Sequence, residues 1–229
     1  IPSQQIKMMW TGYPPFVLHD NAGPTGIYVL IVILIAGSTL GTGVNFITTV
    51  LRFRAKGITL GNTNLMVHGL ISSIVVQLVG VPAFVGAVVM LFLDKYIGTG
   101  FFDSNTGGDP VLFQHLFWFY SHPAVYVMIL PAFGVFSEVL STMSQRPIFG
   151  RTSMIFAIWA IALLGFLVWA HHMFTSGMPQ WLRIFMSFTT VLIAVPTGIK
   201  MFNWVGTLYG GAIRLNTAML STLGGIFMF

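Results

Sequence analysis

The stretch Phe119-Tyr120-Ser121-His122-Pro123-Ala124-Val125-Tyr126 places a titratable ring and two phenols inside a long apolar run. A second pair of rings, His171-His172, stands near the end of another such run. Ionisable side chains are costly inside a bilayer, so a ring found there indicates a functional site. If the first run is helical, His122 and Tyr126 project from one face, about 6 Å apart along the axis. The sequence therefore predicts a cavity shared by a histidine and a phenol.

Three imidazoles from two neighbouring helices suit a transition metal such as copper, zinc, iron or nickel. The chain has only 5 Asp and Glu residues in total, so magnesium or calcium, which take oxygen ligands, is a poor fit. Each element alone has an ordinary explanation, namely a histidine bonded to a carbonyl or a His-His pair at the membrane surface. Their occurrence together favours a metal site with His122, His171 and His172 as ligands.

The composition is that of an integral membrane protein. Of 229 residues, 55% are hydrophobic and 7% are charged, whereas soluble domains have about 25% charged residues. The net charge of +5 resides mostly in short loops, so it indicates topology and gives no support to nucleic-acid binding. The absence of cysteine excludes disulfides, thiolate metal ligands and cysteine-ligated iron-sulfur clusters within this chain.

Apolar runs long enough to cross about 30 Å of hydrocarbon recur along the chain. We expect an all-α, polytopic transmembrane helical bundle, because helices satisfy their own backbone groups in lipid. Residues 1–25 are predicted to form an outer loop, and a sixth, incomplete span begins near Asn216. The five complete spans are expected at 26–52, 64–94, 111–143, 152–175 and 184–209. The chain starts at Ile1 and stops at Phe229 inside an apolar run, so we interpret 1–229 as one partial membrane domain from a longer protein.

Basic residues differ between the two sides of the predicted bundle. One set of loops holds Arg52, Arg54, Lys56, Arg146, Arg151 and Arg214. The opposite side holds Lys7, Lys95 and Arg183, together with Asp20, Asp94, Asp103 and Asp109. Because short basic loops stay in the cytoplasm, or in the matrix of an organelle, the first set is predicted to face inward. His122 and the His171-His172 pair then both fall in the outer part of the membrane, where they can meet.

Polar residues inside the spans suggest routes for protons. Lys200 lies about 24 Å from the outer end of its span, too deep for its amine to reach the outer surface. Thr190 and Thr197 precede it near one helical face, so the three indicate a polar stripe. The alternative is a lysine satisfied by helix carbonyls. Ser137, eleven residues beyond Tyr126, would lie near the inner mouth, although a bond to its own helix explains it at least as well.

A second polar set lies in the first span, where Ser38 and Asn45 are seven residues apart with Thr39 alongside. Small polar residues also hold membrane helices together, so helix packing is the competing explanation. Glu138, the only Glu in the chain, is interpreted as either a proton-uptake residue or an interfacial charge. The remaining histidines are assigned ordinary structural roles: His19, His68 and His115.

At these residues the chain resembles subunit I of the heme-copper terminal oxidases, specifically members of the cytochrome c oxidase type. The similarity covers nearly the whole chain, and its motifs together are highly specific. They are Asn45-Phe46-Ile47-Thr48-Thr49, the segment GGDPVLFQHLFW at 107–118, His122-Pro123-Ala124-Val125-Tyr126, the segment WAHHMF at 169–174, and Pro196-Thr197-Gly198-Ile199-Lys200.

The resemblance implies that His122, His171 and His172 bind the copper of a binuclear heme-copper centre. It also implies that Tyr126 is covalently joined to His122 and supplies an electron and a proton for O–O cleavage. In the family, the histidines that bind heme come from helices before and after this stretch. We therefore expect no axial heme ligand in this chain, which by itself is not a complete or active oxidase.

Two proton paths are implied as well. The residues matching the family's lysine-containing path are Lys200, Thr197 and Ser137. Those matching parts of its second path are Ser38, Thr39 and Asn45. Many members carry Glu between Pro and Val at the end of that second path, whereas this chain has Ala124. Tyr120-Ser121 precedes the histidine instead, as in a recognised branch of the family. Tyr120 stands one turn before Ala124, so its hydroxyl would reach the vacated region.

We therefore expect the catalytic subunit of a respiratory oxidase that reduces O2 to water and moves protons outward. Cytochrome c is the expected electron donor, oxidase subunits II and III are the expected partners, and the bacterial plasma membrane is favoured over the mitochondrial inner membrane. A quinol oxidase and a nitric oxide reductase of the same superfamily are the alternatives, although the reductase uses a non-heme iron and typically lacks counterparts of Tyr126 and Lys200. A copper or proton transporter without redox chemistry would contain no heme.

Overall fold

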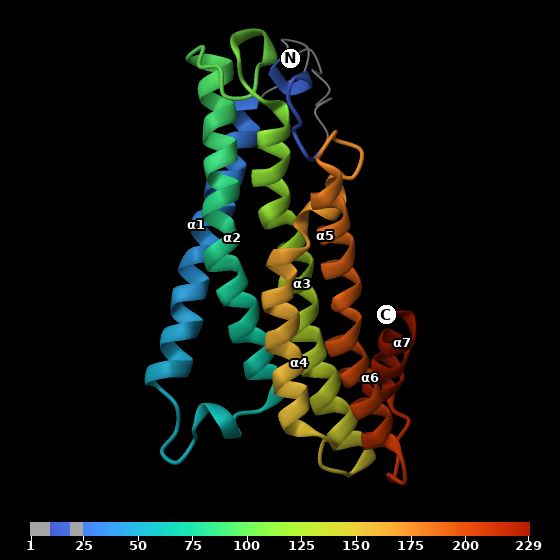
Figure 1. Ribbon diagram of the computed structural model, residues 1–229. Helices are drawn as coiled ribbons and strands as arrows, with labels where there is room; N and C mark the ends of the chain where they lie inside the picture. The colour runs from blue at the N-terminus through green and yellow to red at the C-terminus, as the bar shows by residue number, and fades with distance from the viewer. Residues whose placement is uncertain (1–9, 19–24) are drawn as a thin grey trace.

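The computed structural model describes residues 10–18 and 25–229 (Figure 1). Within these ranges the chain is helical and contains no strand. Five helical stretches are long and apolar enough to cross a membrane, and they run side by side with their loops gathered at two ends. The expected all-α architecture with five spans is confirmed. Lys7, His19 and Asp20 lie outside the described residues, and which end faces inward stays a prediction.

The first three spans are single α-helices that end within two residues of the expected bounds. They are α1 (Thr25–Arg52), α2 (Leu65–Tyr96) and α3 (Pro110–Ser144). The Asn64 side chain accepts a hydrogen bond from the Val67 N–H at 3.0 Å and so caps α2. Asp109 caps α3 in the same way through the Val111 N–H at 2.8 Å. Such caps satisfy N–H groups of the first turn that have no partner within the helix.

The fourth span departs from the continuous helix expected over 152–175. It consists of α4 (Arg151–Leu164), the 3-10 turn η5 (Gly165–Leu167) and the 3-10 helix η6 (Trp169–Met173). The Leu167 carbonyl, at the end of η5, accepts a hydrogen bond from the Thr189 hydroxyl at 2.8 Å. His171 and His172 both belong to η6, so they project from a 3-10 segment, in which three residues complete a turn.

The fifth span also differs from a single helix over 184–209. It consists of α5 (Gln180–Leu192) and α6 (Ala194–Leu208), separated at Ile193, so it begins earlier than expected and is broken. Pro196 explains the break. Proline has no N–H to offer the carbonyl of Leu192, four residues earlier, and its ring crowds that carbonyl.

The break lies between Thr190 and Thr197, but Ile193 keeps right-handed helical geometry (φ −62°, ψ −23°), and Gln180–Leu208 is still one stretch long and apolar enough to cross a membrane. The last helix, α7 (Thr217–Met228), begins where the sixth span was expected. The Asn216 side chain caps it by accepting a hydrogen bond from the Met219 N–H at 3.0 Å.

Helices α2 and α3 make the most extensive contact in the described fold. A Cβ added to Gly69 would lie 2.4 Å from the carbonyl oxygen of Leu130. One added to Gly134 would lie 2.5 Å from the Cα of Met66. Two glycines, one on each helix, thus let the backbones touch, as small residues often do between membrane helices. The contact fixes α3, which carries His122, against α2.

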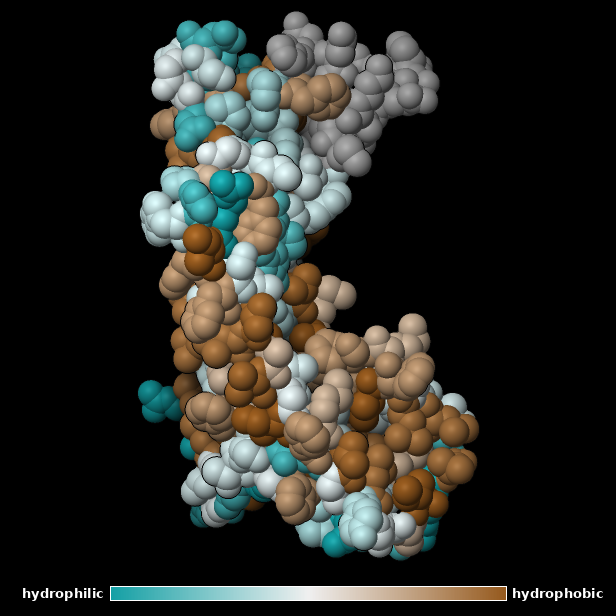
Figure 2. All heavy atoms as spheres, turned by 45° about the vertical axis from the view of Figure 1, so that its right-hand side comes forward, coloured by the Kyte–Doolittle hydropathy of each residue, from teal (hydrophilic) through white to brown (hydrophobic). Residues whose placement is uncertain are grey.

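The surface agrees with a protein that crosses a membrane. Figure 2 shows hydrophobic residues over the middle and lower part of one face, with hydrophilic residues gathered toward the top and along the lower edge. The loops after α1, α3 and α6 lie at the lower end in Figure 1. Arginines donate hydrogen bonds to carbonyls of these loops. Arg151 donates to the Gly61 carbonyl at 2.9 Å and to the Thr63 carbonyl, and Arg146 donates to the Tyr209 carbonyl.

Candidate metal centre

His122, from α3, meets His171 and His172, from η6. One nitrogen of each ring lies within 4.8 Å of the corresponding nitrogens of the other two. The ring centroid of His171 is 4.4 Å from those of His122 and of His172. The structure thus brings together the three residues predicted as ligands. In residues 10–18 and 25–229 no other group of three His, Asp or Glu side chains comes within such a distance.

The hydrogen bonds around the rings identify which nitrogens face one another. His171 Nδ1 lies 2.9 Å from Thr190 Oγ1, and the Thr190 hydroxyl donates to the Met186 carbonyl at 2.6 Å. His171 Nδ1 must therefore carry a hydrogen and donate to Thr190, which leaves the lone pair of the ring on Nε2. His122 Nδ1 lies 3.0 Å from His172 Nε2. The nitrogens available to one metal are thus Nδ1 of His122 and Nε2 of both His171 and His172.

The second nitrogen of His122 is unusual. Nε2 is buried and has no hydrogen-bond partner among the described residues. Leaving a buried polar group unpaired costs about 1–3 kcal/mol. Tyr126 follows one turn later on α3, and its ring centroid is 4.9 Å from that of His122. Nδ1 of His122 thus faces the other histidines, while Nε2 has no partner and belongs to a ring that packs against Tyr126.

The donor set of the cluster fits copper. It consists of three imidazoles, with no carboxylate or thiolate among them. Imidazole suits copper, zinc, iron and nickel, whereas magnesium and calcium take oxygen ligands. The three ring nitrogens that face one another, Nδ1 of His122 and Nε2 of His171 and of His172, are the atoms that would hold the ion.

Trp118 supports His172. The two rings are stacked, with centroids 3.8 Å apart and planes within 5° of parallel. The Trp118 indole N–H donates to the hydroxyl oxygen of Tyr13, in the segment before α1. Burial raises the pKa of the Tyr13 phenol, and the indole hydrogen bond only partly opposes this, so the phenol is neutral. Sequence reasoning missed both residues, although Trp118 stands one helical turn before His122.

The other described histidines have structural partners. Trp169 donates to His115 Nδ1 at 3.2 Å. Trp159 donates to His68 Nδ1 at 3.4 Å, and the other nitrogen of His68 faces the Thr63 hydroxyl at 3.4 Å. Neither ring belongs to the three-histidine cluster, in agreement with the roles predicted for them.

Lys200 lies apart from the cluster, on α6. Its side chain is 0% exposed, and Nζ has no hydrogen-bond partner among the described residues. Nζ lies 4.7 Å from the ring centroid of Phe133 and 5.4 Å from that of Trp204. Two aromatic faces, which attract cations, therefore lie beside the amine. The alternative of a lysine satisfied by helix carbonyls is not what the structure shows.

Tyr126 and Thr197 line one cavity of about 320 Å³. Its other walls are Val125, Ile129, Phe133, Ile161, Ile193 and Phe229. The cavity connects the phenol of the candidate site to the start of α6, the helix that carries Lys200. Thr190, by contrast, is hydrogen-bonded to His171 and does not line this cavity. The structure therefore places Thr197 on the cavity that Tyr126 also lines, and Thr190 at the histidines.

Ser137 joins α3 to α6. Its hydroxyl donates to the Phe133 carbonyl at 2.7 Å and accepts the Trp204 indole N–H at 3.0 Å. The bond to its own helix, predicted as the ordinary explanation, is present. Glu138 accepts the N–H of Leu65, the first residue of α2, at 2.9 Å. Its carboxylate thus stabilises a helix N-terminus.

The residues predicted for the second proton path do not lie together in the structure. Tyr120 and Thr39 line a cavity of about 60 Å³ between α1, α2 and α3, and the Tyr120 ring stacks on Phe84 with centroids 5.2 Å apart. Each water needs roughly 10–15 Å³ of such space and polar partners, so the volume suffices for a few waters, while Tyr120 and Thr39 supply the polar groups of an otherwise apolar lining. Ser38 and Asn45 lie on the exposed face of α1.

Ser121, which precedes the first histidine of the cluster, is buried in α3.

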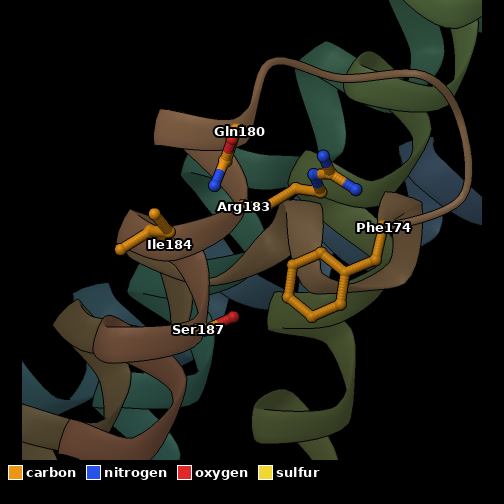
Figure 3. Close-up of a pocket in the computed structure, with 5 residues that line it drawn as sticks. All are labelled: Phe174, Gln180, Arg183, Ile184 and Ser187. Carbon is orange, nitrogen blue, oxygen red and sulfur yellow. The ribbon is translucent and has the colours of Figure 1, made fainter.

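An open hollow of about 570 Å³ lies beside the start of α5 (Figure 3). Its walls are Phe174, Gln180, Arg183, Ile184 and Ser187. Arg183 extends into it from α5, and Phe174 faces it from the segment that follows η6. None of the three clustered histidines lines this hollow, so it is separate from the candidate metal centre.

Comparison with known proteins identifies the family. The sequence model described as "Cytochrome C and Quinol oxidase polypeptide I" matches residues 1–229. The chain is 47% identical over 220 residues to cytochrome c oxidase subunit 1 of a Synechocystis strain. It is 42% identical over 220 residues to the same subunit of Cereibacter sphaeroides, and 42% identical over 222 residues to that of Candida albicans.

Each alignment covers 96% of this chain but only 40%, 39% and 42% of the three relatives in turn. The chain therefore spans about two fifths of the length of these curated relatives. The helical spans, the motifs and the family match agree with one another. The chain belongs to the cytochrome c and quinol oxidase polypeptide I family.

Proposed function

We propose that this chain is the copper-binding central part of the catalytic subunit of a respiratory oxidase that reduces O2 to water. The observation that carries the proposal is the orientation of His122. Its Nδ1 faces the other two histidines, and its Nε2 is buried and unpaired one turn from Tyr126. The relatives, which are named cytochrome c oxidase subunit 1, support this reading.

His122, His171 and His172 would hold the copper. Bound copper and heme together supply the electron transfer that O2 reduction requires. Thr190 holds the ring of His171 through Nδ1, and Trp118 holds the plane of His172. Such partners orient ligand rings before a metal arrives, so the chain supplies a preorganised site.

We also propose that Nε2 of His122 is bonded to a ring carbon of Tyr126 in the mature protein. Formation of this link replaces one N–H and one ring C–H with a C–N bond. It releases two protons and two electrons, which O2, the proposed substrate, takes up. The link uses the one nitrogen of the cluster that is buried without a partner. The phenolic oxygen of Tyr126 stays free to hold and give up a proton.

Protons for the reaction would arrive by two routes. Lys200 would pass them along α6 toward Thr197 and Tyr126, which share a cavity. The second route would use Tyr120, Ser121, Ser38, Thr39 and Asn45, and the cavity shared by Tyr120 and Thr39 supports its upper part. Outward pumping of protons is part of this proposal.

Replacing Tyr120 with Phe tests the second route. A phenol is a far weaker acid than a carboxyl, so we expect Tyr120 to order water and relay a hydrogen bond without staying ionised. Tyr120→Phe keeps the ring that stacks on Phe84 and deletes only the hydroxyl. Turnover and proton pumping in reconstituted vesicles should fall while heme and copper content stay intact. Pumping and turnover equal to the parent would show that Tyr120 serves only in packing.

The electron donor and partners are also proposals. We propose cytochrome c as the donor, oxidase subunits II and III as partners, and the bacterial plasma membrane as the location.

The whole proposal is tested on the full-length protein that contains this chain, purified in detergent. We expect heme bands in the reduced-minus-oxidised absorbance spectrum, copper by metal analysis, and O2 uptake driven by reduced cytochrome c. Uptake driven only by a quinol would identify a quinol oxidase. Reduction of nitric oxide with a non-heme iron in place of copper would identify the reductase. A protein without heme would contradict the proposal and favour a transporter.

A further inference from the structure

Gly165 lies where α4 ends and η5 begins, and it faces the ring of Tyr126. A Cβ added at Gly165 would lie 2.8 Å from Cδ2 and 3.2 Å from Cε2 of Tyr126. Real Cβ atoms essentially never approach another heavy atom closer than 3.0 Å. The ring therefore occupies its position only because residue 165 has no side chain.

The backbone at this position does not require glycine. Gly165 has φ −54° and ψ −28°, which is right-handed helical geometry open to any residue. Alanine is generally favoured over glycine in such a conformation. Gly150, at the other end of α4, is the opposite case, because its φ of 61° is left-handed. What requires glycine at 165 is thus the space taken by the neighbouring ring.

The ring of Tyr126 also borders a cavity in this chain. It lines the cavity of about 320 Å³ together with Ile161, Ile193 and Thr197. A methyl group at Gly165 would push on the Cδ2–Cε2 edge, so the ring would have to shift. Its neighbour His122 has a ring centroid only 4.9 Å away, so a shift of this kind changes the approach of the two rings.

We propose that Gly165 is a positioning residue for Tyr126. By lacking a side chain, it sets the approach of the Tyr126 ring to Nε2 of His122 and so controls formation of the link between them. The inference rests on the proposed function, because the link belongs to that proposal. It adds a residue from η5, directly after α4, to a site otherwise formed by α3, η6 and α5.

The test is Gly165→Ala in the full-length protein. A displacement of 1 Å at a reacting centre can slow a reaction by about 100-fold. We therefore expect the fraction of linked His122–Tyr126 peptide, measured by mass spectrometry after proteolysis, to fall strongly. Heme and copper content should stay near those of the parent. A purely structural glycine would not lower the link at normal metal content.

The matched control is Gly86→Ala. Gly86 is also helical, in α2, and a Cβ there would meet nothing within 4 Å. This variant should form the link as the parent does. If Gly165→Ala fails to bind heme, the double variant Ile161→Ala with Gly165→Ala provides more room for the displaced ring. It should bind heme and copper and still lack most of the link.

The outcomes separate the two proposals. A linked parent and an equally linked Gly165→Ala variant would overturn the role of Gly165 alone. Loss of heme and copper in both the single and the double variant would overturn it too, because Gly165 would then serve the fold of α4. A parent without any link would contradict the proposed bond, and this inference with it.

Discussion

Replacing His172 with Ala in the full-length protein should remove the copper and abolish O2 reduction. Only three ligand side chains meet in the described cluster, and no carboxylate or thiolate is there to substitute for a lost imidazole. Loss of a residue that merely orients a ligand costs roughly 10–100-fold in metal affinity or activity. Loss of a ligand should cost more than that. Metal analysis and O2 uptake measure the two effects separately.

Two further variants separate ligation from packing. His172→Asn keeps a planar polar side chain against Trp118 and should lose copper like the alanine variant. His68→Ala removes a histidine that is bonded to Trp159 and lies outside the cluster, so copper should stay. Unchanged copper content and turnover in His172→Ala would contradict the assignment of this residue as a ligand.

Replacing Lys200 with Met should have opposite effects on stability and on function. Methionine keeps most of the side-chain length, so contacts with Phe133 and Trp204 should survive. It removes a buried amine that has no hydrogen-bond partner, and an unpaired buried polar group costs about 1–3 kcal/mol. The variant should therefore be at least as stable as the parent. Reduction of the heme at the catalytic site should nevertheless become slow, because protons no longer arrive by this route.

The measurements are stopped-flow reduction kinetics, the optical spectrum and thermal unfolding in detergent. Lys56→Met is the matched control, because Lys56 is an exposed lysine in the loop after α1. It should reduce its heme as fast as the parent. Parent-like kinetics in Lys200→Met, with a normal spectrum, would show that Lys200 has a structural role only.

The sequence predicted that the three histidines meet, because their positions follow from the lengths of the apolar runs and from the charges of the loops between them. Apolar runs of sufficient length define the spans, and alternating basic loops define their directions. Together they place His122 and the His171-His172 pair in the same part of the membrane. The helical spacing of His122 and Tyr126 needed only that α3 be continuous, and it is.

The interruptions of the fourth and fifth spans were harder to predict. Pro196 breaks a helix, whereas Pro82, Pro123 and Pro131 lie inside α2 and α3 without ending them. Proline alone is therefore ambiguous in an apolar run. The 3-10 turn after α4 has no proline, and its carbonyl at Leu167 is satisfied from a different helix. Such a partner cannot be read from local sequence.

Contacts between residues far apart in the sequence were also not predictable. The hydrogen bond between Trp118 and Tyr13 joins a helix to a segment more than a hundred residues earlier. No periodicity links the two positions. The closeness of Gly165 to Tyr126 could not be predicted either. Glycine is common in apolar runs, and the contact that requires it here is made with a ring on another helix.

The backbone contact of α2 with α3 at Gly69 and Gly134 implies that the two sides of the candidate metal centre differ in rigidity. At both glycines the nearest atoms of the opposite helix are main-chain atoms, so the two helices are held at backbone distance. His122 and Tyr126 belong to α3, one of these two helices. The histidines of η6 stand instead on 3-10 turns, whose hydrogen bonds have poorer geometry than those of an α-helix. We therefore expect the α3 side of the site to be the more rigid one, with slower amide hydrogen exchange around His122 than around His171 and His172.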